Sequence, residues 1–234
     1  MNRLTHMMIF AAGFGSRLRP LTNSIPKPLL KVGERTLIEY HLERARELGI
    51  EQVVINVSHL AEQIIKFVGS GQRWGVCVSY SHERAPLETA GGLLRAASML
   101  GSEQFLLVNG DVYHECPLQS LLEHASQKMH LLMVPNPPVH PQGDFGLNSQ
   151  NQVVLPGQAQ TLTYAGVALV ESSLLEDMQL AHNDISETHR LAFHLRRWIN
   201  LGWVSGQHFT GRWCDVGTLD RLEELRQQLK VGAP

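Results

Sequence analysis

Short apolar runs alternate with amphipathic segments along the first half of the chain, and this alternation constrains the fold more than any other feature. Strands with buried faces are predicted over residues 7–12, 53–55, 75–80 and 105–108. Apolar spacing predicts helices over residues 36–49, 59–68, 90–100 and 118–127, with Thr36 and Thr89 as N-caps. Strands that alternate with helices form right-handed βαβ units, so we expect an α/β fold with a mixed, mainly parallel sheet.

The second half of the chain has a different pattern. Residues 135–156 are rich in Pro, Gly, Asn and Gln, which predicts turns and a small antiparallel excursion. Residues 162–170 are predicted to form a strand that returns to the sheet. We expect helices near 172–179, 187–201 and 219–229, the last after Thr218, and a short hairpin over 203–214.

Composition excludes several classes of protein. The 20 basic and 22 acidic residues nearly balance, which argues against a dedicated nucleic-acid or membrane-surface binder. Cys77, Cys116 and Cys214 include no C-x-x-C pair, which excludes a zinc ribbon and a thioredoxin-type site. No run of 18 apolar residues occurs, and the run at 7–12 is too short for a signal peptide, so we expect a cytoplasmic protein.

A glycine loop follows the first predicted strand. Residues 13–16 read Gly-Phe-Gly-Ser, and glycines let backbone N–H groups approach an anion closely. Leu18 stands where the dinucleotide fingerprint needs its third glycine, and no Gly-Lys-Ser/Thr follows, which excludes a Walker A loop. Arg17 comes next, and prolines flank Lys27 on both sides. A lysine held against a phosphate needs such a clamp, whereas a surface lysine does not.

Two aspartates occur where a ligand site is expected. Asp111, in Asn109-Gly110-Asp111, directly follows the strand at 105–108, and open α/β sheets bind ligands at the carboxyl ends of their strands. Asp215 lies in Trp213-Cys214-Asp215-Val216-Gly217-Thr218. Each alone could be an ordinary turn residue or the neighbour of a helix cap. Their occurrence together with the clamped Lys27 favours a functional reading.

These motifs together resemble the signature of the sugar-1-phosphate nucleotidylyltransferases. The pattern A-A-G-x-G-x-R-x-x-P…P-K-P-L spans residues 11–29, and the segment 86–92 resembles the part of the family that meets base and ribose. The resemblance implies a Rossmann-like three-layer α/β/α sandwich. It also implies one nucleotidyltransferase domain over 1–234, with a nucleotide-binding half at about 1–115 and a sugar-binding half at about 116–234.

The implied reaction joins a sugar 1-phosphate to the α-phosphorus of a nucleoside triphosphate and releases pyrophosphate. Two unit charges 4 Å apart repel by about 4 kcal/mol at an effective dielectric of 20, so the protein must supply cations and alignment. The attacking oxygen is already ionised and needs no general base. The resemblance assigns Lys27 to the α-phosphate and the sugar phosphate, Arg17 to the β- and γ-phosphates, and Mg²⁺ to Asp111 and Asp215.

The resemblance also supplies candidates for substrate binding. The expected nucleotide-binding residues are Ala11, Ala12, Gly13, Gly15, Ser16, Arg17, Lys27, Glu88 and Gly91. The expected sugar-binding residues are Asn109, Asp144, Gly166 and Arg190. In one departure from the family, no Lys or Arg occurs between Lys128 and Arg190, where related thymidylyltransferases place cations for the sugar phosphate. Lys27, the metal, Arg190 or Arg212 would have to replace them.

Within the family, the closest resemblance is to uridylyltransferases of N-acetylmuramate 1-phosphate, which act in peptidoglycan recycling. UTP and that sugar phosphate are therefore the expected substrates. A mannose-1-phosphate guanylyltransferase or a glucose-1-phosphate thymidylyl- or uridylyltransferase is the alternative. From another class, a non-catalytic nucleotide-sugar sensor would keep the fold without needing Arg17, Lys27, Asp111 and Asp215. We expect no nucleic-acid or membrane partner, and a monomer or small homo-oligomer.

Overall fold

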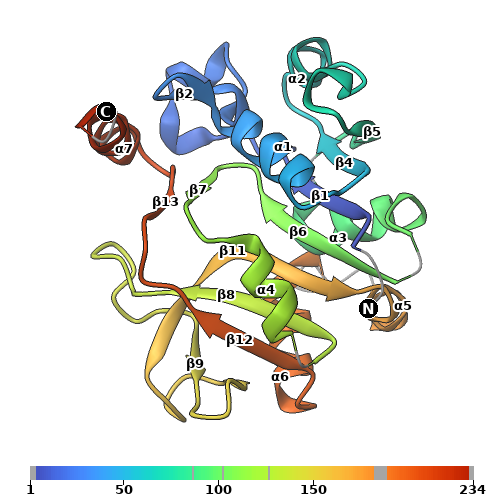
Figure 1. The fold of residues 1–234 in the computed structure, drawn as a ribbon, viewed down its shortest axis with the longest axis vertical. Coiled ribbons are helices and arrows are strands. Elements are labelled where there is room, and N and C mark those ends of the chain that lie inside the picture. Colours follow the sequence, from blue (N-terminus) through green and yellow to red (C-terminus); the bar gives the residue numbers. More distant parts are fainter. Residues whose placement is uncertain (1–3, 86, 102, 126, 182–188, 232–234) are drawn as a thin grey trace.

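A nine-stranded mixed sheet runs through the computed structural model, which describes residues 4–85, 87–101, 103–125, 127–181 and 189–231 (Figure 1). The strand order is β10-β9-β11-β6-β1-β4-β5, and β8 lies between β11 and β12. The strands are β1 (His6–Phe10), β4 (Gln52–Val57), β5 (Cys77–His82), β6 (Gln104–Asn109), β8 (Met129–Val134), β9 (Phe145–Leu147), β10 (Val153–Val154), β11 (Thr161–Glu171) and β12 (Val204–His208).

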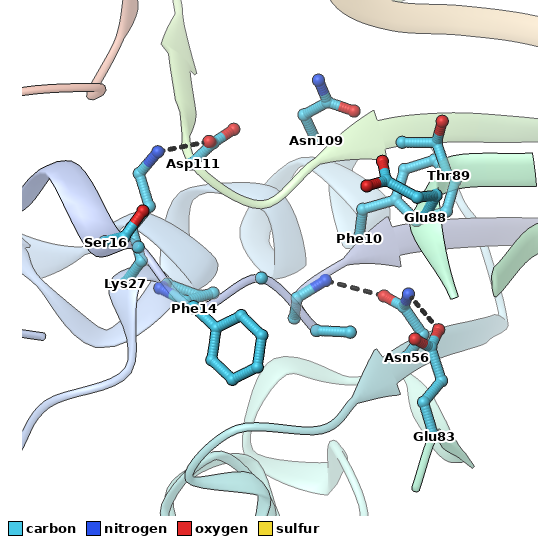
Figure 2. A pocket seen from close by; sticks show the side chains of 15 residues that line it. Phe10, Phe14, Ser16, Lys27, Asn56, Glu83, Glu88, Thr89, Asn109 and Asp111 are labelled. Atoms are coloured by element: carbon cyan, nitrogen blue, oxygen red, sulfur yellow. Dashed lines mark hydrogen bonds and ion pairs between the residues drawn. The ribbon is translucent and has the colours of Figure 1, made fainter. Parts of the chain in front are cut away.

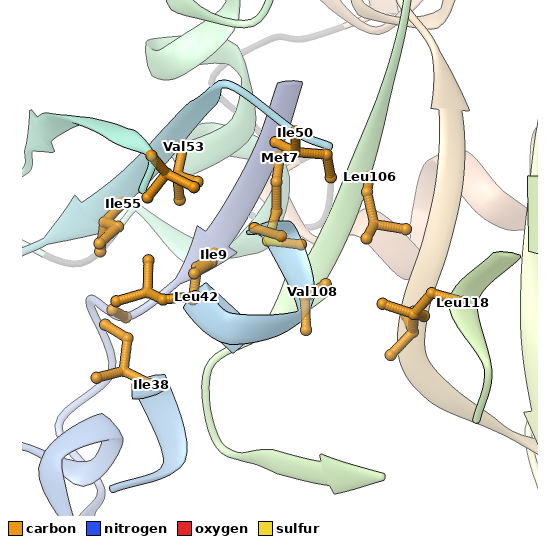
Figure 3. Packing of buried hydrophobic residues seen from close by; sticks show 14 of the residues in the cluster. Met7, Ile9, Ile38, Leu42, Ile50, Val53, Ile55, Leu106, Val108 and Leu118 are labelled. Carbon is orange, nitrogen blue, oxygen red and sulfur yellow. The ribbon is translucent and has the colours of Figure 1, made fainter. Parts of the chain in front are cut away.

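Helices cover both faces of the sheet and form the outer layers. They are α1 (Leu37–Glu47), α2 (Ala61–Val68), α3 (Glu88–Ala96), α4 (Leu118–His124), α5 (Ser173–Ala181), α6 (Leu191–Asn200) and α7 (Leu219–Val231). Because successive side chains of a strand point to opposite faces, β1 feeds two cores. Met7 and Ile9 belong to a core shared with α1, α2 and α4, and Figure 3 shows them with Ile38 and Leu42 of α1. Met8 belongs to a core shared with α3, α5 and α6. The predicted three-layer, Rossmann-like α/β/α fold with a mixed, mainly parallel sheet is confirmed.

The parallel part of the sheet fixes where the site lies. Strand β1 pairs in parallel with β4 and β6, and Phe10 is in register with both Asn56 and Asn109. The segments that leave β1 and β6 therefore emerge side by side. The capping box predicted at Thr36 is present, with Glu39 accepting from the Thr36 backbone N–H at 2.8 Å. It starts α1 against the same end of the sheet.

A third apolar cluster lies outside the two sheet cores. It joins Leu18 and Leu30, which flank the glycine loop and the Lys27 turn, to Val216, Leu222 and Leu225. Helix α7 thereby packs beside β13 (Trp213–Asp215) and the small β2–β3 ribbon (Lys31–Val32, Arg35–Thr36), as Figure 1 shows. The C-terminal helix is thus anchored to the segments that carry the N-terminal motif.

The hairpin predicted over residues 203–214 is wrong. Its first part forms β12, which pairs in parallel with β8, and its second part forms β13, which pairs antiparallel with β7 (Val112–His114). Strand β8 was not predicted, although all six of its residues are buried, because His130 interrupts its apolar run. Strand β12 therefore pairs with the buried strand β8 and not with the residues that follow it in the chain.

Helix α3 begins two residues earlier than the predicted cap implies. Glu88 is its first residue, and the Thr89 hydroxyl oxygen accepts the backbone N–H of Leu191 at 2.9 Å instead of capping its own helix. The predicted antiparallel excursion is present as β9 and β10. Pro86, in the expected base-contacting segment, and Glu187, the expected start of a helix, lie outside the described residues. Among the described residues, no helix has the length and apolar character needed to cross a bilayer.

Candidate active site

A cavity of about 380 Å³ opens where β1 ends, and we call it the loop cavity. The glycine loop forms one wall, and Lys27, Glu88, Asn109 and Asp111 face the same space (Figure 2). Of the expected nucleotide-binding residues, seven line it: Ala11, Ala12, Gly13, Gly15, Ser16, Lys27 and Glu88. Gly91 does not; it lies within α3, where an added Cβ would be 2.9 Å from the Leu87 Cβ.

The two glycines of the loop are needed for different reasons. A Cβ on Gly13 would meet nothing within 4 Å, so the backbone there faces open space. Gly15 has φ 61°, and a Cβ there would lie 2.8 Å from the Thr22 side chain. The Thr22 hydroxyl donates to the Gly15 carbonyl at 2.8 Å and fixes the turn. The loop is therefore open on the cavity side and rigid behind.

A buried polar network supports the loop, and it was not predicted. Asn56 Oδ1 accepts the Ala11 backbone N–H at 2.7 Å, and Asn56 Nδ2 donates to Glu83 Oε1 at 2.7 Å (Figure 2). Glu83 Oε2 in turn accepts the Leu87 N–H at 2.9 Å. Both side chains are buried, and an asparagine inside the apolar run of β4 was the available signal. The network ties the end of β1 to the start of α3.

Glu88 adopts a backbone conformation that is uncommon for a residue with a side chain. Its φ is 60°, in the left-handed region, which costs of order 1–3 kcal/mol unless the surroundings impose it. Its neighbours are held on both sides, Leu87 by Glu83 and Thr89 by Leu191. The exposed Glu88 side chain is consequently presented at the loop cavity.

Lys27 and Asp111 form an ion pair at the edge of the loop cavity. Lys27 starts a short 3-10 turn over Lys27–Leu29, which the Leu29 N–H closes by donating to the Pro26 carbonyl at 2.8 Å. The lysine side chain is only 11% exposed, whereas that of Asp111 is 32% exposed. The turn fixes the backbone of Lys27, and the ion pair with Asp111 holds its ammonium group at the edge of the cavity.

Strand pairing brings the two predicted metal ligands together. Asp215 is in register with Val112 across β13 and β7, and the Val216 N–H donates to the Asp111 carbonyl at 3.0 Å. Arg221 from α7 was not predicted in the site. Its Nη1 donates to Asp215 Oδ2 at 3.0 Å and to the Asp215 carbonyl at 3.1 Å.

Gly217 allows these groups to approach one another closely. A Cβ there would lie 3.3 Å from Arg221 Nη1, 3.4 Å from Asp215 Oδ1 and 3.5 Å from Arg17 Cζ. Arg17, expected among the nucleotide-binding residues, thus lies beside Asp215 and outside the lining of the loop cavity. The glycine of the W-x-D-x-G-T pattern is required by packing, since its φ is not in the left-handed region.

A second cavity of about 510 Å³ shares Asn109 and Asp111 with the first, and we call it the aspartate cavity. Its lining includes Arg17, Asp215 and Arg221, together with the expected sugar-binding residues Asn109, Asp144 and Gly166. Gly166 has φ 74°, and a Cβ there would come within 2.6 Å of Asn109 Nδ2. Arg190 is exposed and belongs to the lining of neither cavity, and Arg212 pairs with Glu115 at 2.7 Å.

Asp144 makes two hydrogen bonds within the protein. Its Oδ2 accepts the Tyr164 backbone N–H at 2.9 Å, and its Oδ1 accepts from His140 Nε2 at 3.0 Å. His140 lines the aspartate cavity and was not predicted. Its position four residues before Asp144 in a Pro- and Gly-rich loop gave no periodic signal.

The donor set suits a magnesium ion shared with phosphate oxygens. Mg²⁺ in such sites takes one or two carboxylates together with substrate phosphates and water. Asp111, directly before β7, and Asp215, on the paired strand β13, provide two carboxylates, and each side chain is 32% exposed. The described residues contain no cluster of three or more His, Cys, Asp or Glu able to hold a metal by themselves. The fit therefore depends on phosphate oxygens as the remaining ligands.

Two buried histidines lie behind Asp111. Burial, reinforced by the nearby Arg44 guanidinium, lowers the pKa of His41 to about 3. Burial and the same guanidinium hold the pKa of His114 well below its usual range. Arg44 bonds the His114 ring at 2.6 Å, and His41 lies close enough to Asp111 for the carboxylate to act on its pKa. Both imidazoles are neutral packing groups at neutral pH.

Cationic side chains and two carboxylates lie between two cavities, an arrangement that suits the transfer of a phosphate-containing group from one anion to another. A family model described as Nucleotidyl transferase matches residues 6–231. The chain therefore belongs to the nucleotidyl transferase family and is an enzyme, and its resemblance to the sugar-1-phosphate nucleotidylyltransferases is confirmed.

Individual relatives agree with this assignment. The chain is 40% identical over 228 residues to N-acetylmuramate alpha-1-phosphate uridylyltransferase of Neisseria meningitidis serogroup B, covering 94% of this chain and 96% of that protein. It is 35% identical over 132 residues to UTP–glucose-1-phosphate uridylyltransferase of Synechocystis, covering 52% of this chain but only 34% of that protein. A solved UDP-glucose pyrophosphorylase from Acinetobacter baumanii shares the fold, with a TM-score of 0.79, 18% identity and coverage of 99% and 95%.

Proposed function

We propose that the protein transfers a nucleotidyl group from UTP to N-acetylmuramate 1-phosphate and releases pyrophosphate. The observation that carries this proposal is the Lys27–Asp111 pair at the junction of two cavities. One cavity presents the glycine loop, and the other presents the polar groups expected to bind a sugar. The full-length similarity to the Neisseria enzyme supports uridylyl transfer to this acceptor. The proposal places the reaction in cytoplasmic peptidoglycan recycling.

In the proposed reaction the triphosphate lies along the glycine loop, whose backbone N–H groups would face its oxygens. The Lys27 ammonium would contact the α-phosphate and the incoming sugar phosphate, because Lys27 lines the loop cavity and pairs with Asp111, which lines both cavities. No proton has to be removed from the attacking phosphate oxygen. Lys27 thus acts by reducing charge repulsion and aligning the reactants.

Asp111 and Asp215 would hold the Mg²⁺ ion, with Arg221 fixing the carboxylate of Asp215. The ion, when bound, would neutralise charge on the phosphates and on the departing pyrophosphate. Arg17 lies beside Asp215, on the side where the β- and γ-phosphates would approach such an ion. The chain itself brings two aspartates and three cationic side chains, those of Arg17, Lys27 and Arg221, to one end of the sheet.

Pyrophosphate release tests the proposal directly. The enzyme with Mg²⁺ is assayed with UTP, dTTP, GTP, CTP and ATP against the 1-phosphates of N-acetylmuramate, N-acetylglucosamine, glucose and mannose. We expect the highest kcat/KM for UTP with N-acetylmuramate 1-phosphate. Higher values for GTP with mannose 1-phosphate, or for dTTP or UTP with glucose 1-phosphate, would replace the proposed substrates by those alternatives. Nucleotide binding without turnover of any pair would refute catalysis.

A further inference from the structure

We propose that His140, held by Asp144, recognises a carboxylate carried by the acceptor sugar in addition to its 1-phosphate. In this assignment Asp144 is a positioning residue that acts through His140. The inference rests on the proposed function and deepens it, because it names the side chain that distinguishes an acidic acceptor from a neutral one.

The first support is the hydrogen bonding of Asp144. Both carboxylate oxygens already have partners, the Tyr164 N–H at 2.9 Å and His140 Nε2 at 3.0 Å. A carboxylate only accepts hydrogen bonds, so the Tyr164 backbone fixes Asp144, and Asp144 orients the imidazole. Within the described residues, Nδ1 of His140 has no such partner, and the side chain is 41% exposed in the lining of the aspartate cavity.

The second support is the distribution of charge around this cavity. Its basic side chains are Arg17, His140 and Arg221. The two arginines lie close to Gly217 and Asp215, on the side of the cavity where the metal is proposed. No Lys or Arg occurs between Lys128 and Arg190 in the sequence, so His140 is the basic side chain that this segment contributes to the cavity lining.

The third support is the rigidity of the loop that carries His140. The His140 backbone N–H donates to the Pro137 carbonyl at 2.8 Å, and the His140 carbonyl accepts the Gly143 N–H at 3.2 Å. Asn136 anchors the loop, because it accepts the Thr163 hydroxyl at 2.9 Å and donates to the Thr161 carbonyl at 3.2 Å. Preorganisation of this kind is typical of a binding group.

The ligand chemistry follows from the imidazole. The bond to Asp144 occupies Nε2, so a carboxylate of the acceptor would bind through a proton on Nδ1, as an imidazolium with both ring nitrogens as donors. N-acetylmuramate carries such a group in its ether-linked lactyl substituent, whereas N-acetylglucosamine is the same sugar without it. His140 would therefore distinguish these two acceptors.

Steady-state kinetics with both acceptors and saturating UTP test the inference. We compare the wild type with H140Q, D144N and the double variant, and with H208Q as the matched control, since His208 is exposed at the end of β12 and lines neither cavity. Thermal melting checks that each variant folds. H140Q is expected to lower kcat/KM for N-acetylmuramate 1-phosphate by about 10- to 100-fold, mainly through KM, as for loss of a charge-assisted hydrogen bond.

The loss for N-acetylglucosamine 1-phosphate should be at least several-fold smaller, and D144N should add little to H140Q, because Asp144 acts through the histidine. Equal losses for both acceptors, full additivity of the two substitutions, or no loss in H140Q would overturn the inference. So would a wild type that turns over neutral sugar phosphates but rejects the acidic one. If the wild type releases pyrophosphate with no pair of substrates, the proposed function itself fails.

Discussion

Replacing Lys27 is a direct test of the proposed mechanism. Lys27→Ala should lower kcat by roughly 10²–10³, as for loss of one preorganised charge that stabilises the transition state. The free energy of unfolding should change little, because Asp111 is partly exposed and water can solvate it once its partner is gone. Pyrophosphate release and urea unfolding measure the two effects. A variant with near-normal turnover would remove Lys27 from the mechanism.

Asp111 should determine the metal requirement. Asp111→Asn keeps the size of the side chain but removes a charged oxygen ligand, so half-maximal activity should need at least tenfold more Mg²⁺. Asp220→Asn is the control, because Asp220 is an exposed carboxylate in the first turn of α7. A metal titration that matches the wild type would exclude Asp111 as a ligand.

Asn56 should matter for both folding and nucleotide binding. Asn56→Ala leaves the Ala11 N–H and Oε1 of the buried Glu83 carboxylate without their Asn56 partner, at about 1–3 kcal/mol for each group. Unfolding free energy should therefore fall by about 2–6 kcal/mol, and KM for the triphosphate should rise as the loop loses its support. Asn200→Ala, at an exposed helix end, should change neither quantity. An unaltered KM in a destabilised Asn56 variant would limit the network to a structural role.

Among whole elements, we expect α7 to couple the stability of the fold to the geometry of the site. Leu222 is fully buried in the third apolar cluster, one residue after Arg221. Leu222→Ala should cost about 2–5 kcal/mol of unfolding free energy and lower kcat/KM, because the helix positions Arg221 on Asp215. Leu219→Ala, at a 38% exposed position of the same helix, should do neither. Full activity in a destabilised Leu222 variant would show that α7 does not control the site.

Local patterns were a good guide to some elements and a poor guide to others. The capping box at Thr36 and the strands of the parallel half were predicted because their signals lie within one segment. The predicted hairpin failed because β12 and β13 each pair with a strand far away in the sequence. A local apolar pattern can indicate that a segment forms a strand, but it does not indicate which distant strand that segment pairs with.

For the whole molecule, the two buried histidines should make folding sensitive to acid. His41 and His114 stay neutral when folded but bind protons when unfolded below pH about 6.5, so stability should fall as the pH decreases toward about 3. Each contributes a slope of up to about 1.4 kcal/mol per pH unit. His114→Gln should flatten the dependence of unfolding free energy on pH by about that amount. An unchanged slope would contradict neutral burial of His114.

Patterns along the chain were sufficient to predict the class of fold and to single out the glycine loop after β1, the proline-flanked Lys27 and the two aspartates. These depend on apolar period and on short motifs, which are properties of neighbouring residues. Only the tertiary structure brought Arg221 to Asp215, His140 to Asp144, and Asn56 and Glu83 to the back of the loop. Most of these partners lie far apart along the chain, and even the short-range pairs owe their place in the site to the packing of the strands and α7 that carry them.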